Sequence, residues 1–349
     1  MTGFDYGNAR LRVRAASWLS AAGYRGLLAA SSLDGLLGSL AQLDYSEDVS
    51  AAMSRHQGIR RLDEAVRTHL SRELGDVLSF YSGGVADRLR VLLSRWDLRN
   101  VRSILRDLAG RRQQTPGTAT LVAAGAFEAR TLEEIASQRD VRAAVDLLSV
   151  WGLPSPGVVR HLRHALPAFT ESGDVLVLED ALDRALGELA AADRGEGDRV
   201  SELLSREVDR VNLMSELRLR ADAGLTGVVA HEPIAGGAVH PEVWSELAAL
   251  NDSALGSELP TRVDPIWRPA LSAWFEHRDL PRLDTDLDHA AALESIACFR
   301  RGDPLGIDVP IGYIGQQEAQ AANLRLIGRA VNHDLDRNET FDRLLGVVA

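Results

Sequence analysis

The chain has 349 residues, with 39 basic and 50 acidic side chains and a formal net charge of −11. The sequence contains no lysine, so every basic residue other than histidine is arginine. The acidic balance argues against a nucleic-acid scaffold. The absence of lysine excludes Schiff-base chemistry and a Walker A phosphate loop. The one cysteine, Cys298, cannot form a disulfide within the chain, which fits a reducing compartment.

The sequence predicts a soluble protein. Asp5, Arg10, Arg12 and Arg14 place too much charge near the N-terminus for a signal peptide. The longest weakly polar run, 117–127, is far too short to cross a bilayer. The length is sufficient for two or three domains, each with its own core.

In the first third of the chain, the sequence predicts short helices followed by long ones. Ser20 and Ser32 are suitable N-caps. Apolar residues recur at spacings of three and four through 46–81, with a break expected at Gly58. We expect helices at about 4–19, 20–30, 33–43, 46–81 and 85–108.

The second and third portions predict the same order of short and long helices. Thr131 to Glu134 has the capping-box pattern, so a short helix is expected to begin there. Another helix is expected to begin near Pro241, and a last helix, capped near Asn338, is expected to run to the end. The remaining helices are expected at about 140–151, 157–168, 175–192, 197–220, 265–278, 286–301 and 311–331. Strand patterns are few and aromatic residues make up 5% of the chain, so the fold class is predicted to be all-α.

A short motif occurs three times. It reads WDLRNVRSILR at 96–106, VDRVNLMSELR at 208–218 and AQAANLRLIGR at 319–329. Its asparagines, Asn100, Asn212 and Asn323, are separated by 112 and 111 residues. Each asparagine is followed by an apolar residue and, six places on, by an arginine.

A second motif has the same spacing. The segments 122–136 and 234–248 match at a glycine, Gly125 and Gly237, which are again 112 residues apart. Two motifs at one offset indicate an internal duplication, and the third asparagine extends it to three copies. A period this long predicts three similar helical domains, at 1–112, 113–225 and 226–349.

Asparagine is a poor helix former, so its recurrence inside predicted helices needs a reason. In the first two copies an aspartate, Asp97 or Asp209, precedes it by three residues and so lies on the same helix face. Such side chains can hold the backbone of a neighbouring loop or helix end. We therefore interpret Asp97, Asn100, Asp209, Asn212 and Asn323 as structural residues that fix the fold, with a ligand site as the less favoured alternative.

Two groups of residues could suggest a metal site. The acidic cluster from Asp284 to Asp288 fails as an EF-hand, because His289 stands where glycine is needed and Ser295 where glutamate is needed. To hold a metal in a helical enzyme the cluster would need a second motif of metal ligands. The segment that begins at Asn251 matches such a motif only poorly. His161 and His164 lie on one helix face but have no third ligand nearby. No catalytic, metal or cofactor site is predicted.

Several motifs together resemble the C subunit of A-type and V-type rotary ATPases, the equivalent of the d subunit of vacuolar ATPases. They are YGNAR at 6–10 with Arg14, the helix at 24–28, SLDGLL at 32–37, WDLRNVRSILR at 96–106, the glycine openings at 125 and 237, and YIGQQEAQAANLRLI at 313–327. The resemblance covers nearly the whole chain. The third copy departs from it, with Gln320 where an acidic residue is expected.

The resemblance implies a fold and a role. It implies three helical domains around a pseudo-threefold axis, forming a funnel on the cytoplasmic face of a proteolipid ring. The funnel would receive the central stalk and couple it to the ring for proton or sodium transport, without catalysis and without a cofactor. The partners would be the central-stalk subunits and the ring. Two alternatives stay open, a helical scaffold of unrelated biology and a metal-dependent all-α enzyme that uses the Asp284 cluster.

Overall fold

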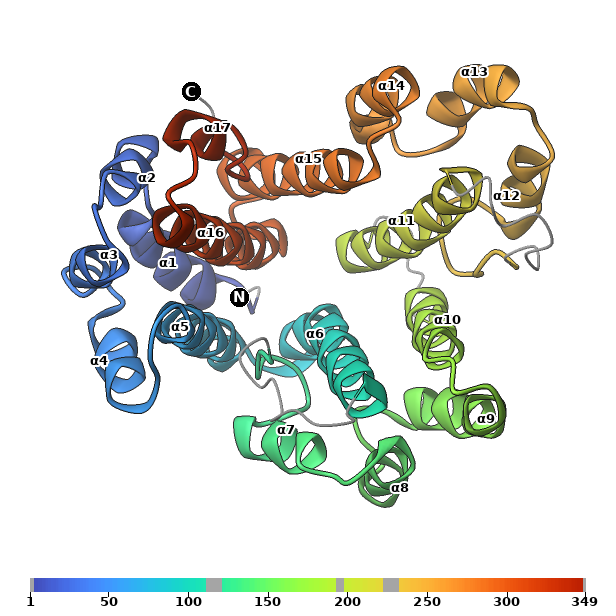
Figure 1. The fold of residues 1–349 in the computed structure, drawn as a ribbon, viewed down its shortest axis with the longest axis horizontal. Helices are drawn as coiled ribbons and strands as arrows, with labels where there is room; N and C mark the ends of the chain where they lie inside the picture. Colours follow the sequence, from blue (N-terminus) through green and yellow to red (C-terminus); the bar gives the residue numbers. More distant parts are fainter. Residues whose placement is uncertain (1–2, 111–120, 193–197, 222–231, 348–349) are drawn as a thin grey trace. The chain divides into compact units, whose positions relative to one another are not determined.

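The computed structural model describes residues 3–110, 121–192, 198–221 and 232–347. Within these ranges the chain forms seventeen α-helices and no β-strand, so the all-α prediction is confirmed (Figure 1). The helices fall into two compact units, which we describe separately. Unit 1 comprises Met1–Ser103, Gln114–Ala136 and Ala291–Ala349, and unit 2 comprises Ile104–Gln113 and Ser137–Ala290.

Unit 1 contains the helices from both ends of the chain. They are α1 (Asp5–Arg14), α2 (Ala21–Leu28), α3 (Leu33–Leu40), α4 (Ser46–Arg55), α5 (Arg60–Ser79), most of α6 (Gly83–Gly110), α7 (Ala129–Ala136), the second half of α15 (Leu280–Arg301), α16 (Asp308–His333) and α17 (Arg337–Asp342). The Oγ atoms of Ser20 and Ser32 cap α2 and α3, as predicted, by accepting hydrogen bonds from the N–H groups of Gly23 and Gly35. Gly58, with φ of 57°, lies in the predicted break between α4 and α5.

The core of unit 1 is built on two long helices, α5 and α16, which pack side by side (Figure 1). They approach closely at Gly328, where a Cβ atom would stand 1.9 Å from Cδ2 of Leu62. Leu62 and Leu70 of α5 and Leu324 of α16 are all buried. Because only glycine leaves room for Leu62, this contact fixes the register of the two helices.

Unit 2 contains the remaining helices. They are α8 (Val141–Trp151), α9 (Pro156–Ser172), α10 (Leu176–Ala192), α11 (Arg199–Ala221), α12 (Pro241–Ala248), α13 (Asp252–Arg262), α14 (Arg268–His277) and the first half of α15. Helix α9 packs on α8 and α10, and α10 packs on α11. The C-terminal part of α11 joins a core with α12 to α15 that contains three tryptophans, Trp244, Trp267 and Trp274.

Several helix ends differ from the predictions. Helix α7 begins at Ala129, so Thr131 lies in its first turn and does not cap it. Helix α17 is capped by Asp336, two residues before Asn338, but it ends at Asp342 and does not run to the end of the chain. Helix α15 begins at Leu280, six residues earlier than predicted. These ends are set by local caps and by packing, which periodicity alone does not resolve.

Two further differences involve proline and asparagine. Helix α9 continues through Pro167 to Ser172, beyond the predicted end at about Ala168. The missing N–H of Pro167 is outweighed by the packing of the apolar face around Leu162 and Leu166, which are buried. Helix α13 was not predicted, and the Asn251 side chain caps it by accepting a hydrogen bond from Ala254 N–H at 3.0 Å. The Asn251 segment is therefore a helix start.

Candidate functional site

Three asparagines make the same pair of hydrogen bonds with a peptide unit. Nδ2 of Asn100 donates to the carbonyl of Val122 at 2.8 Å, and the N–H of Val122 donates to Oδ1 at 3.0 Å. In each case the bonded residue lies 22 places after the asparagine. The other two pairs are Asn212 with Ile234, at 2.9 and 2.8 Å, and Asn323 with Leu345, at 3.0 and 2.7 Å.

The chemistry of these pairs explains why asparagine recurs. A primary amide carries a donor and an acceptor side by side, so it can satisfy the N–H and the C=O of one residue together. All three asparagine side chains are buried, where an unsatisfied peptide group costs free energy. Asn100 and Asn212 thereby hold the loop that follows their own helix, and Asn323 holds the segment that follows α17.

The two aspartates hold the same loops at a second point. Oδ2 of Asp97 accepts a hydrogen bond from Ala126 N–H at 2.8 Å, and Oδ2 of Asp209 accepts one from Ala238 N–H at 2.9 Å. The preceding glycine gives the carboxylate its space. A Cβ atom on Gly125 would stand 2.1 Å from Oδ2 of Asp97. The glycine motif and the aspartate motif of the sequence are therefore the two sides of one contact.

Burial changes the acidity of both aspartates. Removal from water raises the pKa of Asp97 to about 6, against the opposing effect of the hydrogen bonds from Ala126 and Phe127. Burial likewise raises the pKa of Asp209 to about 6, although the N–H groups of Val239 and Ala238 lower it. Backbone N–H groups donate hydrogen bonds to both carboxylates, and at Asp209 the Trp244 side chain also lowers the pKa.

In the third copy Gln320 replaces the aspartate and makes different contacts. Its Oε1 accepts a hydrogen bond from Leu19 N–H at 3.0 Å, and its Nε2 donates to the hydroxyl of Tyr45 at 3.1 Å. Glutamine can donate as well as accept, which a carboxylate cannot. The glutamine that replaces the aspartate in the third copy therefore connects the N-terminal segment to α16.

The YGNAR segment connects α1 to distant parts of unit 1. Asn8 is buried, its Nδ2 donates to the carbonyls of Pro304 and Gly306, and its Oδ1 accepts from the hydroxyl of Tyr81 at 2.6 Å. A Cβ atom on Gly7 would stand 2.3 Å from the Tyr81 ring. The glycine and the asparagine of this motif therefore place one aromatic ring and one loop against α1.

The acidic cluster of α15 contacts an arginine. Nη2 of Arg210, in α11, lies 2.7 Å from Oδ1 of Asp284, and its Nη1 pairs with Asp288. These carboxylates raise the pKa of Arg210, which burial opposes. A guanidinium between two carboxylates occupies the position that a cation would need. This geometry favours an ion pair over a metal site.

The other candidate residues from the sequence also have structural surroundings. His161 lies 2.9 Å from the carboxylate of Glu188, and Cys298 is buried. Within residues 3–110, 121–192, 198–221 and 232–347, no group of three or more His, Cys, Asp or Glu side chains could hold a metal ion. None of the helices in these ranges is long and apolar enough to span a membrane.

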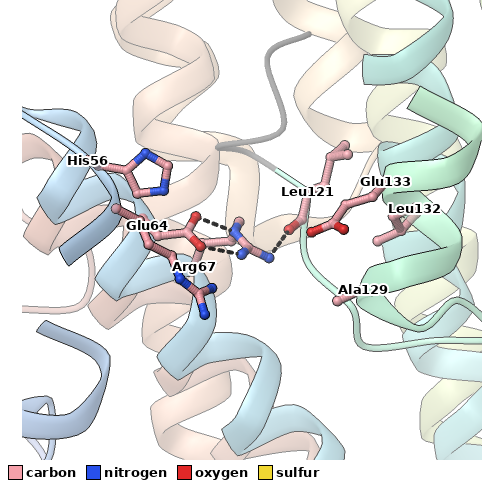
Figure 2. Close-up of a pocket in the computed structure, with 8 residues that line it drawn as sticks. His56, Glu64, Arg67, Leu121, Ala129, Leu132 and Glu133 are labelled. Atoms are coloured by element: carbon pink, nitrogen blue, oxygen red, sulfur yellow. Dashed lines mark hydrogen bonds and ion pairs between the residues drawn. The ribbon is translucent and has the colours of Figure 1, made fainter. Parts of the chain in front are cut away.

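A small pocket of about 190 Å³ lies in unit 1 between α5, the α4–α5 turn and α7 (Figure 2). Arg67 occupies its wall, and its Nε and Nη2 bind both oxygens of Glu64 at 2.8 and 2.6 Å. Its Nη1 donates to the carbonyl of Leu121 at 3.2 Å. The hydrogen bond to Arg67 lowers the pKa of Glu64. Because these donors are satisfied within the chain, the pocket does not present Arg67 to a ligand.

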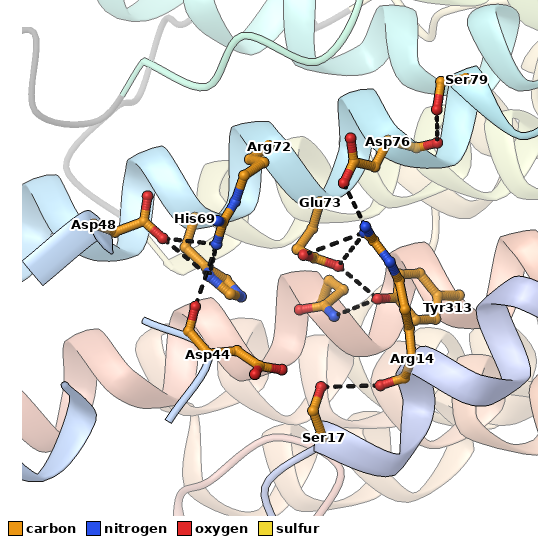
Figure 3. A network of polar contacts seen from close by, with 11 residues as sticks. Arg14, Ser17, Asp44, Asp48, His69, Arg72, Glu73, Asp76, Ser79 and Tyr313 are labelled. Atoms are coloured by element: carbon orange, nitrogen blue, oxygen red, sulfur yellow. Dashed lines mark hydrogen bonds and ion pairs between the residues drawn. The ribbon is translucent and has the colours of Figure 1, made fainter. Parts of the chain in front are cut away.

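A polar network on α5 was not predicted from the sequence (Figure 3). The hydroxyl of Tyr313 donates to Glu73 at 2.6 Å, and Arg14 bridges Glu73 and Asp76, with Nη2 2.7 Å from Asp76. Arg72, next to Glu73 on α5, binds the buried carboxylate of Asp48 at 2.8 Å. The network joins α1, α4, α5 and α16 within unit 1.

The sequence contained a signal for this network. His69, Arg72, Glu73 and Asp76 follow one another at spacings of three, one and three, which is a polar stripe on one helix face. A stripe of this kind normally faces solvent, so the sequence alone suggested no partners. The partners come from helices up to 240 residues away.

Comparison with known proteins identifies the family. A model of the ATP synthase (C/AC39) subunit family matches residues 7–343. The chain belongs to this family. The sequence-based recognition of a rotary-ATPase C subunit is thus confirmed.

The relatives cover almost the whole chain. The chain is 24% identical over 336 residues to the C subunit of the V-type ATP synthase of Deinococcus radiodurans, covering 96% of this chain and 89% of the relative. It is 27% identical over 359 residues to the C subunit of the A-type ATP synthase of Halobacterium salinarum, covering 96% of each. It is 26% identical over 346 residues to the C subunit of the V-type ATP synthase of Thermus thermophilus, covering 98% of each.

Proposed function

We propose that this chain is the non-catalytic C subunit of a V/A-type ATP synthase or ATPase. The observation that carries this proposal is the family match over 7–343, together with relatives named as C subunits that align along nearly their full length. The geometry is consistent with a structural role. The polar groups that recur in the sequence hold loops, and the acidic cluster of α15 is paired with Arg210.

Within that complex we propose the role of a socket. The chain would connect the central-stalk subunits to the proteolipid ring on the cytoplasmic face of the membrane, and so couple ATP turnover to proton or sodium movement. Such a part must resist torque through its shape and through many modest contacts, because single rim charges contribute little. The network of α5 and the paired asparagines are the kind of internal bracing that this role requires.

We also propose that the chain consists of three homologous helical repeats, at 1–112, 113–225 and 226–349. The support is the identical pairing of Asn100, Asn212 and Asn323 with a residue 22 places further on. Three similar units joined by repeated contacts can close around a common axis. An experimental structure in which the three asparagine helices fail to superpose after alignment of the repeats would refute this part.

The test of the socket role is reconstitution with and without the chain. Vesicles containing the membrane sector, the stalk and the catalytic head are assayed for ATP hydrolysis and, in parallel, for ion uptake. Without this chain, hydrolysis by the head should continue while ion uptake is lost. Arg343→Ala is the control, since Arg343 is exposed and pairs with Glu339 of the same helix end, and it should pump normally. Undiminished coupled uptake without the chain would refute the proposal.

A further inference from the structure

A buried histidine on α5 shares one carboxylate oxygen with an arginine (Figure 3). Nη2 of Arg72 lies 2.8 Å from Oδ2 of Asp48, and Nδ1 of His69 lies 3.2 Å from the same oxygen. Nη2 of Arg72 also lies 2.9 Å from Nδ1 of His69. His69 is 3% exposed and Asp48 is 5% exposed. Three polar atoms therefore meet in mutual contact, largely out of water.

The charge of His69 decides which of these contacts are hydrogen bonds. In a neutral ring with its proton on Nε2, Nδ1 is an acceptor and receives a hydrogen bond from Arg72, which also donates to Asp48. In an imidazolium both ring nitrogens are donors, so Nδ1 donates to Asp48 and opposes the guanidinium N–H that faces it. A proton added at Nδ1 therefore exchanges one partner of Asp48 for another.

The surroundings of His69 suit an imidazolium. The ring of Tyr45 stacks on the imidazole, with the ring centroids 3.7 Å apart and an interplanar angle of 21°. An aromatic face attracts a cation, and burial raises the pKa of Tyr45, so its ring stays neutral. Nε2 of Gln320 donates to the Tyr45 hydroxyl at 3.1 Å and holds the ring in place. The folded chain thus offers a protonated His69 both a carboxylate and an aromatic face.

Arg72 has a second carboxylate close by. Its Nη1 lies 3.7 Å from Oε2 of Glu47, whose side chain is 88% exposed. Nε of Arg72 is buried and has no hydrogen-bond partner among the described residues. A move outward to Glu47 would bring this nitrogen to water and remove the cost of its burial. The same move would break the hydrogen bond from Nη2 to the carbonyl of Asp44 at 3.3 Å, which holds the turn before α4 against α5.

Each element around this site contributes further charged or titratable side chains. They are Tyr24 of α2, Glu47 of α4, Glu73 of α5, and Tyr313 and Arg325 of α16. Burial raises the pKa of both tyrosines, which keeps them neutral. Glu73 accepts a hydrogen bond from Tyr313, and arginine keeps its charge near neutral pH. Histidine is the side chain type that changes charge between about pH 5 and 8, so His69 is the proton acceptor of this cluster.

We propose that His69 is a proton-operated switch for the turn that precedes α4. With His69 neutral, Arg72 binds Asp48, His69 and the Asp44 carbonyl, and the turn is held against α5. When Nδ1 of His69 takes up a proton from solvent, it donates to Asp48, and Arg72 moves to Glu47 at the surface. The switch requires no partner of the chain, so it stands or falls independently of the proposed function.

The experiment is a pH titration of the full chain, followed by nuclear magnetic resonance of labelled histidine and arginine side chains. The ring resonances of His69 report its charge, and the Nε–Hε resonance of Arg72 reports the surroundings of the guanidinium. Each is assigned by its loss in His69→Gln or Arg72→Gln. Between about pH 8 and 5 the two resonances of the wild type should shift with a common midpoint.

Two variants test whether His69 causes the change at Arg72. In His69→Gln the Arg72 resonance should stay constant over this range, although Asp97 still titrates there, because burial raises its pKa to about 6. His333→Gln removes an exposed histidine of α16 and should leave the transition as in the wild type. Circular dichroism establishes that His69→Gln keeps the helical fold.

Three results would overturn the switch. They are a His69 ring that does not change charge between about pH 5 and 8, an Arg72 resonance that stays constant or shifts with a separate midpoint while His69 titrates, and an unchanged Arg72 transition in folded His69→Gln. If His69→Gln does not fold, the wild-type titration still decides, because common and separate midpoints are read from it alone.

Discussion

The asparagine pairs give the most direct test of how the long helices hold their loops. In Asn212→Ala both hydrogen bonds to Ile234 are lost, and the N–H and C=O of Ile234 are left buried. An unsatisfied buried polar group costs about 1–3 kcal/mol, so two of them should destabilise this part of unit 2 by about 2–6 kcal/mol. The loss should be local at first, because the loop can detach while α11 stays folded.

The assay is hydrogen exchange at the amide of Ile234. A single unfolding midpoint is not a suitable measure, because the chain contains two compact units. In the wild type the Ile234 amide is held by the side chain of Asn212 and should exchange slowly. A loss of about 2 kcal/mol corresponds to exchange faster by roughly 30-fold, since about 1.4 kcal/mol is a factor of ten.

Two variants sharpen this prediction. Asn212→Asp keeps the acceptor for the Ile234 N–H but places a second acceptor against the Ile234 carbonyl. The exchange rate of the Ile234 amide in this variant should therefore lie between the rates in the wild type and in Asn212→Ala. Asn332→Ala changes an exposed asparagine of α16 and should alter stability by less than about 0.5 kcal/mol. If Asn212→Ala leaves the Ile234 amide as protected as in the wild type, the reasoning is wrong and other contacts hold the loop.

The other predictions concern the aspartates and glycines of the same loops. Because burial raises the folded-state pKa of Asp97 and of Asp209 to about 6, above the ordinary value near 3.9, protonation favours the fold. Their contribution is fully present below about pH 4 and is lost as the pH rises through about 6. Measured by hydrogen exchange at the Ala126 amide, which Asp97 holds, the wild type should therefore gain local stability relative to Asp97→Asn as the pH falls from 7 to 4, by at most about 3 kcal/mol; a relative loss would show that the N–H bonds outweigh burial. Gly237→Ala should destabilise unit 2, because its Cβ atom would stand 2.0 Å from Oδ1 of Asp209, whereas Gly84→Ala meets no atom within 4 Å and should be neutral or stabilising. The measurement is hydrogen exchange at the Val239 amide, which Asp209 holds; equal protection of this amide in the wild type and in Gly237→Ala would contradict the close contact.

The sequence by itself determined the fold class and most of the helices. Apolar residues at spacings of three and four locate α5, α6, α10, α11 and α16 to within a few residues, because burial of one face imposes that period. Ser20 and Ser32 fixed two helix starts through a hydrogen bond that is local in the chain. The family could also be recognised, because its motifs lie along almost the whole chain.

Only the tertiary structure decided what the polar residues do. The sequence placed Asn100 and Asp97 on one helix face, but their partners, Val122 and Ala126, lie in a loop whose path depends on packing. The same is true of the pair between Tyr313 and Glu73, which are 240 residues apart. A periodic pattern reports which face of a helix is buried, whereas the atom that a buried polar group meets is fixed by the approach of distant segments. The sequence therefore identified where the constraints lie, and the folded chain supplied their partners.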